Sequence, residues 1–274
     1  MPVTFSHPAA VVPFTRIGCV FSALVVGSMV PDTWHMVPDL LHRADTHSLV
    51  GQFTYTLPVG LVILALFHHF LKMPLFTLMP RGMQAQLLTI AQHRFRWWPL
   101  PRFALIAFSI WMGGITHIFW DSFTHSNGWA VRSWAPLRAV VYVSNNSYMG
   151  REPITVSYIL QHISSIFGVL VLVLLYQRWQ KNAPVETVPE CFRLTSTAKT
   201  LFWILPVPVM ALVAFYYGDW FSAQWHLHFI AVPKVPKLIL LGRQIMAAVD
   251  AFAIYLLSFC AFMQLRWTFT RIQP

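Results

Sequence analysis

Five long apolar runs limit the folds that this chain can adopt. Four of them contain no Asp, Glu, Lys or Arg, and the fifth contains only Asp250. About 20 apolar residues in a helix cross a hydrocarbon core roughly 30 Å thick. We therefore expect an all-α, polytopic integral membrane protein with about five transmembrane helices. The runs are residues 57–71, 103–120, 156–176, 201–217 and 244–265.

The overall composition agrees with a membrane protein. Hydrophobic residue types make up 57% of the chain and charged types 10%, whereas about 25% of the residues in a typical soluble domain are charged. A sixth apolar stretch, residues 9–30, is interrupted by Pro13 and Arg16. We expect it to form a short, re-entrant or spanning helix. The N-terminus lacks the cationic start of a cleaved signal peptide, so we expect the mature protein to begin at Met1.

The positions of the cations predict the orientation of the helices. Lys and Arg number 19 against 9 Asp and Glu, which gives a formal net charge of +10. Lys72, Arg81, Arg94, Arg96 and Arg102 lie between the first two runs, with no acid among them. Such loops stay in the cytoplasm, so alternating spans place residues 31–56, 121–155 and 218–237 on the opposite side. The basic excess then indicates topology and contact with membrane lipids, and no nucleic-acid partner is expected.

The densest group of polar residues is His117, Asp121 and His125, each four residues from the next. In a helix this spacing places imidazole and carboxylate groups on one face, where they can bind a metal ion. A charged Asp near the end of a span is costly unless it is paired, hydrated or metal-bound. The alternative is a polar helix end at the membrane interface, but the combination of three ligands at four-residue spacing favours a metal site.

Three shorter segments add candidate ligands in the N-terminal region. His7 lies in a Ser-His-Pro segment, and Pro31 is expected to end the first apolar stretch so that Asp32 emerges there. His42 and His47 flank Arg43 in a third polar segment. By local criteria each segment also fits an ordinary interfacial loop.

The order of these motifs resembles a known family. Ser-His-Pro, Gly-Ser-Met-x-Pro-Asp, His-Arg-x-x-Thr-His-Ser and His-x-x-x-Asp-x-x-x-His follow one another within residues 1–170. This order resembles the bacterial membrane proteins grouped as domain of unknown function 4184, and it is similar to YdjM-like membrane-bound metal-dependent hydrolases. Both groups are distantly similar to the zinc-dependent phospholipase C superfamily, whose helical enzymes hold metals with His and Asp.

The resemblance implies a specific ligand set and location. Asp121 or Asp32 would bridge two ions, and Ile166 stands where those enzymes have a Glu after their last ligand, which favours two ions over three. His and Asp ligands favour zinc, with manganese or iron as alternatives. The implied location is the bacterial inner membrane, with the site facing the non-cytoplasmic side. The implied ligands are His7, Asp32, His47, His117, Asp121, His125 and His162.

The expected activity is hydrolysis of a phosphoester, with a lipid or lipid-linked phosphate as the leading substrate, because paired metal ions activate water and stabilise the reacting oxygens. Asp121 and Asp32 would be catalytic, and Arg43 would neutralise the phosphate, with Arg132, Arg138 and Arg151 as weaker candidates. One alternative is a transporter whose polar path includes Asp250, and another is a non-catalytic membrane protein. We expect one membrane-embedded domain over residues 1–274, with the hydrolase-like region in 1–170 and two further transmembrane helices in 199–274.

Overall fold

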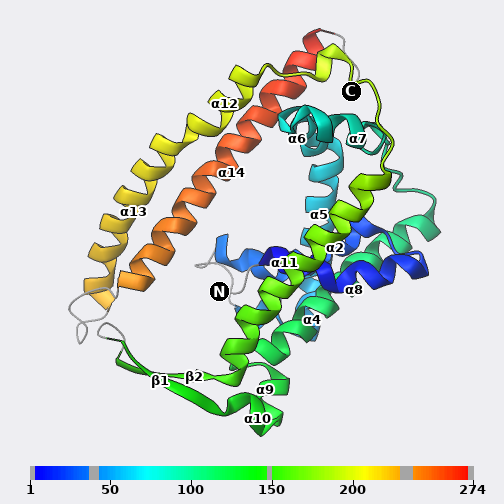
Figure 1. The fold of residues 1–274 in the computed structure, drawn as a ribbon. Coiled ribbons are helices and arrows are strands. Elements are labelled where there is room, and N and C mark those ends of the chain that lie inside the picture. Colours follow the sequence, from blue (N-terminus) through cyan, green and yellow to red (C-terminus); the bar gives the residue numbers. More distant parts are fainter. Residues whose placement is uncertain (1–3, 37–42, 147–149, 229–236, 271–274) are drawn as a thin grey trace. The chain divides into compact units, whose positions relative to one another are not determined.

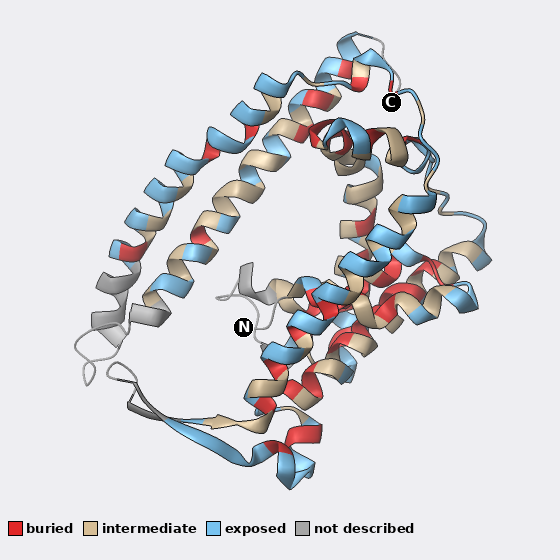
Figure 2. Cartoon of the chain, viewed as in Figure 1, coloured by how far each residue is buried: buried red, intermediate tan, exposed pale blue. Residues whose placement is uncertain are grey.

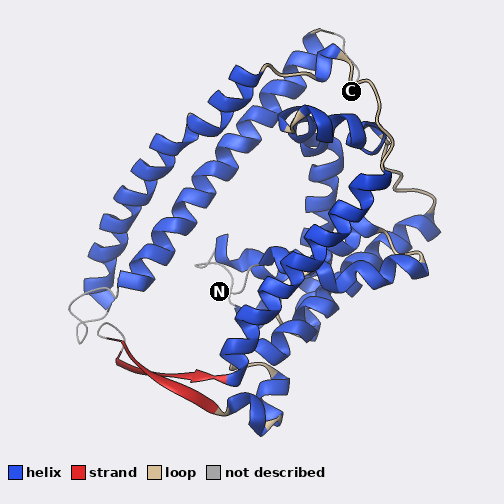
Figure 3. Ribbon diagram, viewed as in Figure 1, coloured by secondary structure: helices blue, strands red, loops and turns tan. Residues whose placement is uncertain are grey.

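The computed structural model describes residues 4–36, 43–146, 150–228 and 237–270 (Figure 1). Helices dominate this part of the chain, and its only strands form one hairpin (Figure 3). Five helical segments are long and apolar enough to cross a membrane, and each contains one of the five runs predicted from the sequence. The predicted fold class is thus confirmed, and the chain is a multi-pass membrane protein. The five segments are Leu49–Leu78, Leu100–Ser133, Val156–Asn182, Glu190–Trp220 and Leu240–Phe269.

The chain divides into two compact units. The first unit comprises Met1–His68, Arg94–Asn146 and Gly150–Ala183, and the second comprises His69–His93, Ser147–Met149 and Pro184–Pro274. The expectation of a single domain stays a prediction. All the candidate metal ligands lie in the first unit.

The N-terminal segment of the first unit is a chain of short helices. A 3-10 turn (η1, Thr4–Ser6), α1 (Pro8–Val11) and a second 3-10 helix (η2, Val12–Ile17) end at Gly18, whose φ of 87° is left-handed and favours glycine. After this break come α2 (Phe21–Met29) and η3 (Val30–Met36). Neither part reaches the roughly 20 residues of a full span. Of the forms expected for residues 9–30, the structure contains short helices, and α2 ends just before Pro31, as predicted.

Close packing of α2 against α8 (Leu100–Thr124) forms the centre of the first unit. A Cβ atom at Gly27 would overlap the backbone of Ile110, and one at Gly113 would overlap the backbone of Leu24. The two backbones therefore approach each other more closely than larger residues would allow. Figure 2 shows buried residues concentrated along these helices. The crossing brings the end of α2 beside the C-terminal half of α8.

The rest of the first unit surrounds this crossing. Its helices include α3 (Arg43–Thr46), α4 (Leu49–Gly51), the π-helix η4 (Gln52–Thr56) and α5 (Leu57–Leu66). A second π-helix, η5 (Phe67–Leu71), begins in this unit and continues into the second. After α8 come α9 (Trp129–Ser133), α10 (Ala135–Arg138), the antiparallel strands β1 (Val140–Asn146) and β2 (Gly150–Thr155), and α11 (Val156–Asn182). The hydroxyl of Thr155 caps α11 by accepting a hydrogen bond from the backbone of Tyr158.

The second unit contains α6 (Lys72–Leu78), α7 (Arg81–Gln92), η6 (Glu190–Phe192), α12 (Ser196–Ile204), α13 (Pro206–His228) and α14 (Lys237–Phe269). Phe76, Phe192 and Trp267 are the largest members of its buried cluster. The buried amide of Gln84 donates hydrogen bonds to the carbonyl oxygens of Phe76 and Thr77. Helices α13 and α14 pack along each other.

Candidate metal centre

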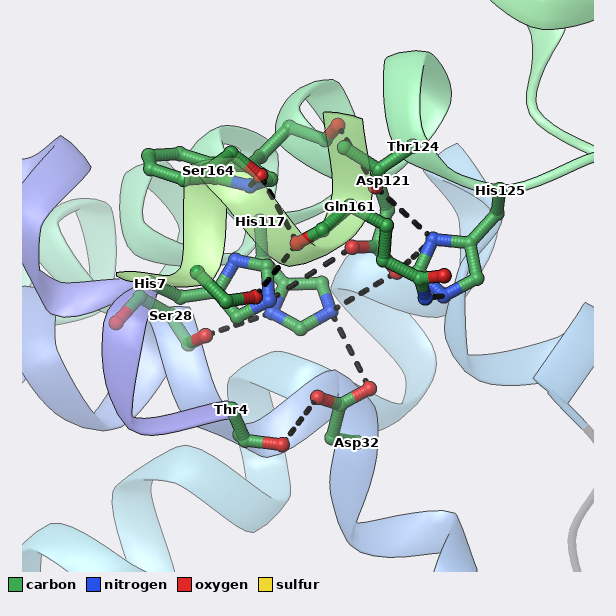
Figure 4. A network of polar contacts seen from close by, with 12 residues as sticks. Thr4, His7, Ser28, Asp32, His117, Asp121, Thr124, His125, Gln161 and Ser164 are labelled. Atoms are coloured by element: carbon green, nitrogen blue, oxygen red, sulfur yellow. Dashed lines mark hydrogen bonds and ion pairs between the residues drawn. The ribbon is translucent and has the colours of Figure 1, made fainter. Parts of the chain in front are cut away.

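Six of the seven predicted ligands converge in the first unit, although they come from segments far apart in the sequence. His117 and Asp121 lie on α8 and His125 follows that helix directly, while Asp32 lies in η3. His47 follows α3, and His7 lies between η1 and α1. One ligand atom from each of Asp32, His47, His117 and Asp121 lies within 4.8 Å of the other three. Figure 4 shows the network that these side chains form.

The separations within this group of four are short and similar. His47 Nε2 lies 3.5 Å from Asp32 Oδ1 and 3.4 Å from Asp121 Oδ2. His117 Nε2 lies 3.5 Å and 3.6 Å from the same two oxygens. The Nε2 atoms of His47 and His117 are 3.2 Å apart. Two imidazole nitrogens and two carboxylate oxygens thus face one common point.

A backbone contact fixes the ring of His117. Its Nδ1 donates a hydrogen bond of 2.7 Å to the carbonyl oxygen of Ser28, at the end of α2. The α2–α8 crossing supplies this partner. This bond keeps a proton on Nδ1, so Nε2 either carries a second proton between Asp32 and Asp121 or, in the neutral ring, offers its lone pair to a cation there.

Asp32 is held as a carboxylate. The hydroxyl of Thr4 donates a hydrogen bond of 2.6 Å to Oδ2 (Figure 4). Oδ1 faces His47 and His117. Burial raises the pKa of Asp32, but hydrogen bonding to His117 and His47 lowers it by more. The net pKa lies well below its ordinary value.

His7 and His125 lie on two sides of Asp121. His7 is only 1% exposed, stacks on the ring of His117, and places Nε2 3.7 Å from Asp121 Oδ1. Within the described residues neither ring nitrogen of His7 has a hydrogen-bond partner. Burial, together with the charge of His117, lowers the pKa of His7 to about 3, so its ring is neutral. His125 places Nδ1 3.4 Å from Asp121 Oδ2, and its Nε2 lies 3.1 Å from the amide nitrogen of Gln161.

Comparison with protein families assigns the chain to one family. The model described as Domain of unknown function (DUF4184) matches residues 1–261. The chain belongs to this family. The match confirms the family expected from the motifs and extends well beyond residue 170. No curated protein and no solved structure matched the chain.

A cavity of about 520 Å³, called here the metal cavity, opens onto the candidate metal ligands of this DUF4184 protein. His47 and Asp121 form part of its wall, and Arg132, at the end of α9, lines it as well. The guanidinium of Arg138 instead donates a hydrogen bond to the carbonyl oxygen of Arg132. The side chains of Arg43 and Arg151 lie outside the described residues, so the role of Arg43 stays a prediction. Of the four candidate arginines, the structure thus brings Arg132 to the site.

His162 is not brought into the group of ligands. Its ring is exposed, and Nδ1 bonds to the carbonyl oxygen of Tyr158 in its own helix. The preceding residue, Gln161, contacts His125 instead. Sequence reasoning missed Gln161 and the supporting groups of Thr4 and Ser28. Thr4 and Ser28 stand close to ligand motifs in the sequence, whereas the orientation of α11 decides between Gln161 and His162.

Proposed function

We propose that this protein is a membrane-bound, metal-dependent phosphoester hydrolase whose metal centre consists of Asp32, His47, His117 and Asp121. The observation that carries this proposal is the spacing of the four ligand atoms, with His–Asp separations of 3.4 to 3.6 Å. Ligands about 2.0–2.2 Å from a tetrahedral zinc ion lie about 3.3–3.6 Å from each other. Most hydrogen bonds between nitrogen and oxygen are shorter, at about 2.7–3.2 Å. The spacing therefore suits ligands that share a cation.

The orientation of His117 also supports a cation at this point. Because Nδ1 holds a proton, the neutral ring would aim the Nε2 lone pair between two carboxylates, where a metal ion can accept it. A divalent cation compensates these charges. The hydrogen bond from the distal ring nitrogen to a backbone carbonyl is the usual outer partner of a metal-bound histidine.

His7 supports a second ion. It faces Oδ1 of Asp121, whereas His47, His117 and His125 face Oδ2, which makes Asp121 the candidate bridging residue. The buried, neutral ring of His7 lacks a hydrogen-bond partner among the described residues, as a histidine reserved for a metal would. The ligand set favours zinc, with manganese or iron as alternatives.

The neighbouring cavity suggests the reaction. Bound ions would activate water and polarise a phosphoester. From the chain itself, Arg132 provides a guanidinium that can bind phosphate oxygens in a bidentate manner, and Asp32 and Asp121 hold the ions. The similarity of the motif order to YdjM-like hydrolases and to the zinc-dependent phospholipase C superfamily points to the same chemistry. We place the protein in the bacterial inner membrane among its lipids, with the site on the non-cytoplasmic side, because the basic loops predict that orientation.

Metal content and hydrolysis can be measured on the same purified protein. We supplement wild type, His117→Ala and Asp121→Asn with zinc or manganese. Mass spectrometry then measures the bound metal, and release of nitrophenolate from bis(p-nitrophenyl) phosphate measures hydrolysis. We expect metal and metal-dependent nitrophenolate release in wild type. Both variants should lose at least about tenfold in metal affinity, the lower end of the cost of losing even an outer partner.

Asp45→Asn is the matched control, because Asp45 is an exposed acid close to His47 in the sequence. It should retain both metal and activity. A well-folded wild type that stays metal-free after supplementation would overturn the metal site. Bound metal without hydrolysis of this ester or of phosphate monoesters would overturn the enzymatic function alone.

A further inference from the structure

A second cavity, of about 600 Å³, adjoins the metal cavity in the first unit. Ile115 and Phe119 line both cavities, so the two share a wall on α8. The second cavity, called here the α8–α11 groove, is lined mainly by apolar side chains. They include Phe14, Met112, Trp120, Phe123 and Leu160.

The polar side chains of the groove already have hydrogen-bond partners within the protein. The hydroxyl of Thr116 donates to the carbonyl oxygen of Gly113, and the hydroxyl of Thr124 donates to that of Trp120. The indole of Trp120 donates to the hydroxyl of Ser164. A polar ligand would gain little from such walls, whereas a hydrocarbon chain would bury apolar surface against them.

The location of the groove indicates how a chain would reach it. Its walls come mainly from α8 and α11, both of which belong to candidate membrane spans. Leu49, Phe119 and Trp129 line the metal cavity and are all more than half exposed. Apolar side chains at this rim favour contact with lipid over contact with a water-soluble substrate.

The metal cavity carries positive charge, whereas the adjoining α8–α11 groove is apolar. Among the residues that line the metal cavity, only Arg132 has a permanent positive charge. Resting on the proposed function, we propose that the substrate is a phosphoester with a long hydrocarbon chain. Its phosphate lies in the metal cavity beside Arg132, and its chain lies in the α8–α11 groove.

Two chromogenic diesters that differ only in chain length test this proposal. p-Nitrophenyl hexadecyl phosphate and p-nitrophenyl ethyl phosphate have the same leaving group, so the chain alone distinguishes them. With metal-loaded wild type we expect kcat/KM to favour the hexadecyl ester at least tenfold. Met112→Trp places a larger side chain in the groove and should reduce this preference to less than threefold.

Phe108→Trp is the matched control, because Phe108 lies one turn earlier on α8, is exposed and lines neither cavity. Measured in the same detergent, it should keep the wild-type preference. If Met112→Trp fails to fold, Leu160→Trp fills the groove from α11.

The outcomes separate the two proposals. Cleavage of both esters without chain preference, or equal preference in the groove variant and the control, would overturn the groove assignment and leave the hydrolase standing. If neither ester is cleaved by metal-loaded protein, the phosphodiester hydrolase and the groove assignment both fail.

Discussion

His7 and His162 are both histidines of the first unit, but only His7 lies against Asp121. His7 is almost fully buried and aims Nε2 at Asp121 Oδ1. His162 is exposed and bonds to its own helix. We therefore expect His7→Ala to lose at least half of the bound metal, because the ligand beside one oxygen of Asp121 is removed. Metal bound per chain, measured by mass spectrometry, checks this.

His162→Ala serves as the control and should keep the wild-type metal content. Equal losses in the two variants would argue against the division of roles between these histidines. Full retention of metal in His7→Ala would remove His7 from the ligand set, while the inner group of four would stand.

At the scale of secondary-structure elements, the crossing of α2 and α8 positions the candidate metal centre. Any side chain at Gly113 overlaps the backbone of Leu24. Gly113→Ala should therefore push the helices apart and weaken the contact between Ser28 and His117. Overpacking of this kind costs about 1 to 3 kcal/mol. We expect a lower midpoint of thermal unfolding together with reduced metal content.

Gly82→Ala is the matched substitution, because a Cβ atom at Gly82 meets nothing within 4 Å. In a helix, replacing glycine by alanine at an open position stabilises by up to about 1 kcal/mol. The midpoint of thermal unfolding of Gly82→Ala should equal or exceed that of wild type. If Gly113→Ala unfolds at the same temperature as wild type, the two helices tolerate a wider separation.

The elements differ in how far the sequence predicts them. The five spans were predictable because a charge-free run must be helical to satisfy its backbone in lipid. The strands β1 and β2 were not predicted, although Val140, Val141, Tyr142 and Val143 are residue types that favour strands. The break at Gly18 depends on a left-handed backbone conformation, which an apolar pattern does not reveal.

The residues of the candidate site also differ in how far the sequence predicts them. His117, Asp121 and His125 could be grouped from their spacing on one helix, since residues four apart share a face. His7, Asp32 and His47 come from separate segments, and only the order of the family motifs linked them to the others. Gln161 was missed because nothing in an apolar helix such as α11 indicates which of two adjacent polar residues faces a partner.

At the scale of the whole molecule, the arrangement of charges predicts how the chain lies in the membrane. Lys72, Arg81, Arg94 and Arg96 precede α8 and Arg102 lies in its first turn, whereas the candidate metal ligands lie near its far end. A helix of 25 residues at about 1.5 Å per residue is about 37 Å long, which exceeds a hydrocarbon core of roughly 30 Å. The two ends of α8 should therefore lie on opposite sides of the membrane.

Cysteine labelling in intact cells tests this orientation. Of the native cysteines, Cys19 and Cys260 are buried and Cys191 is partly exposed. The labelling variants are therefore made in a Cys191→Ser protein, which lacks the partly exposed native thiol. In it, Ser126→Cys should react with a membrane-impermeant maleimide from outside the cytoplasm. Gln92→Cys should react only after the membrane is permeabilised, because the basic loop before α8 stays in the cytoplasm. Ser126 and Gln92 are both exposed, so accessibility to solvent is matched. The reverse pattern would move the metal centre to the cytoplasmic face, and labelling of both positions from one side would show that α8 does not cross.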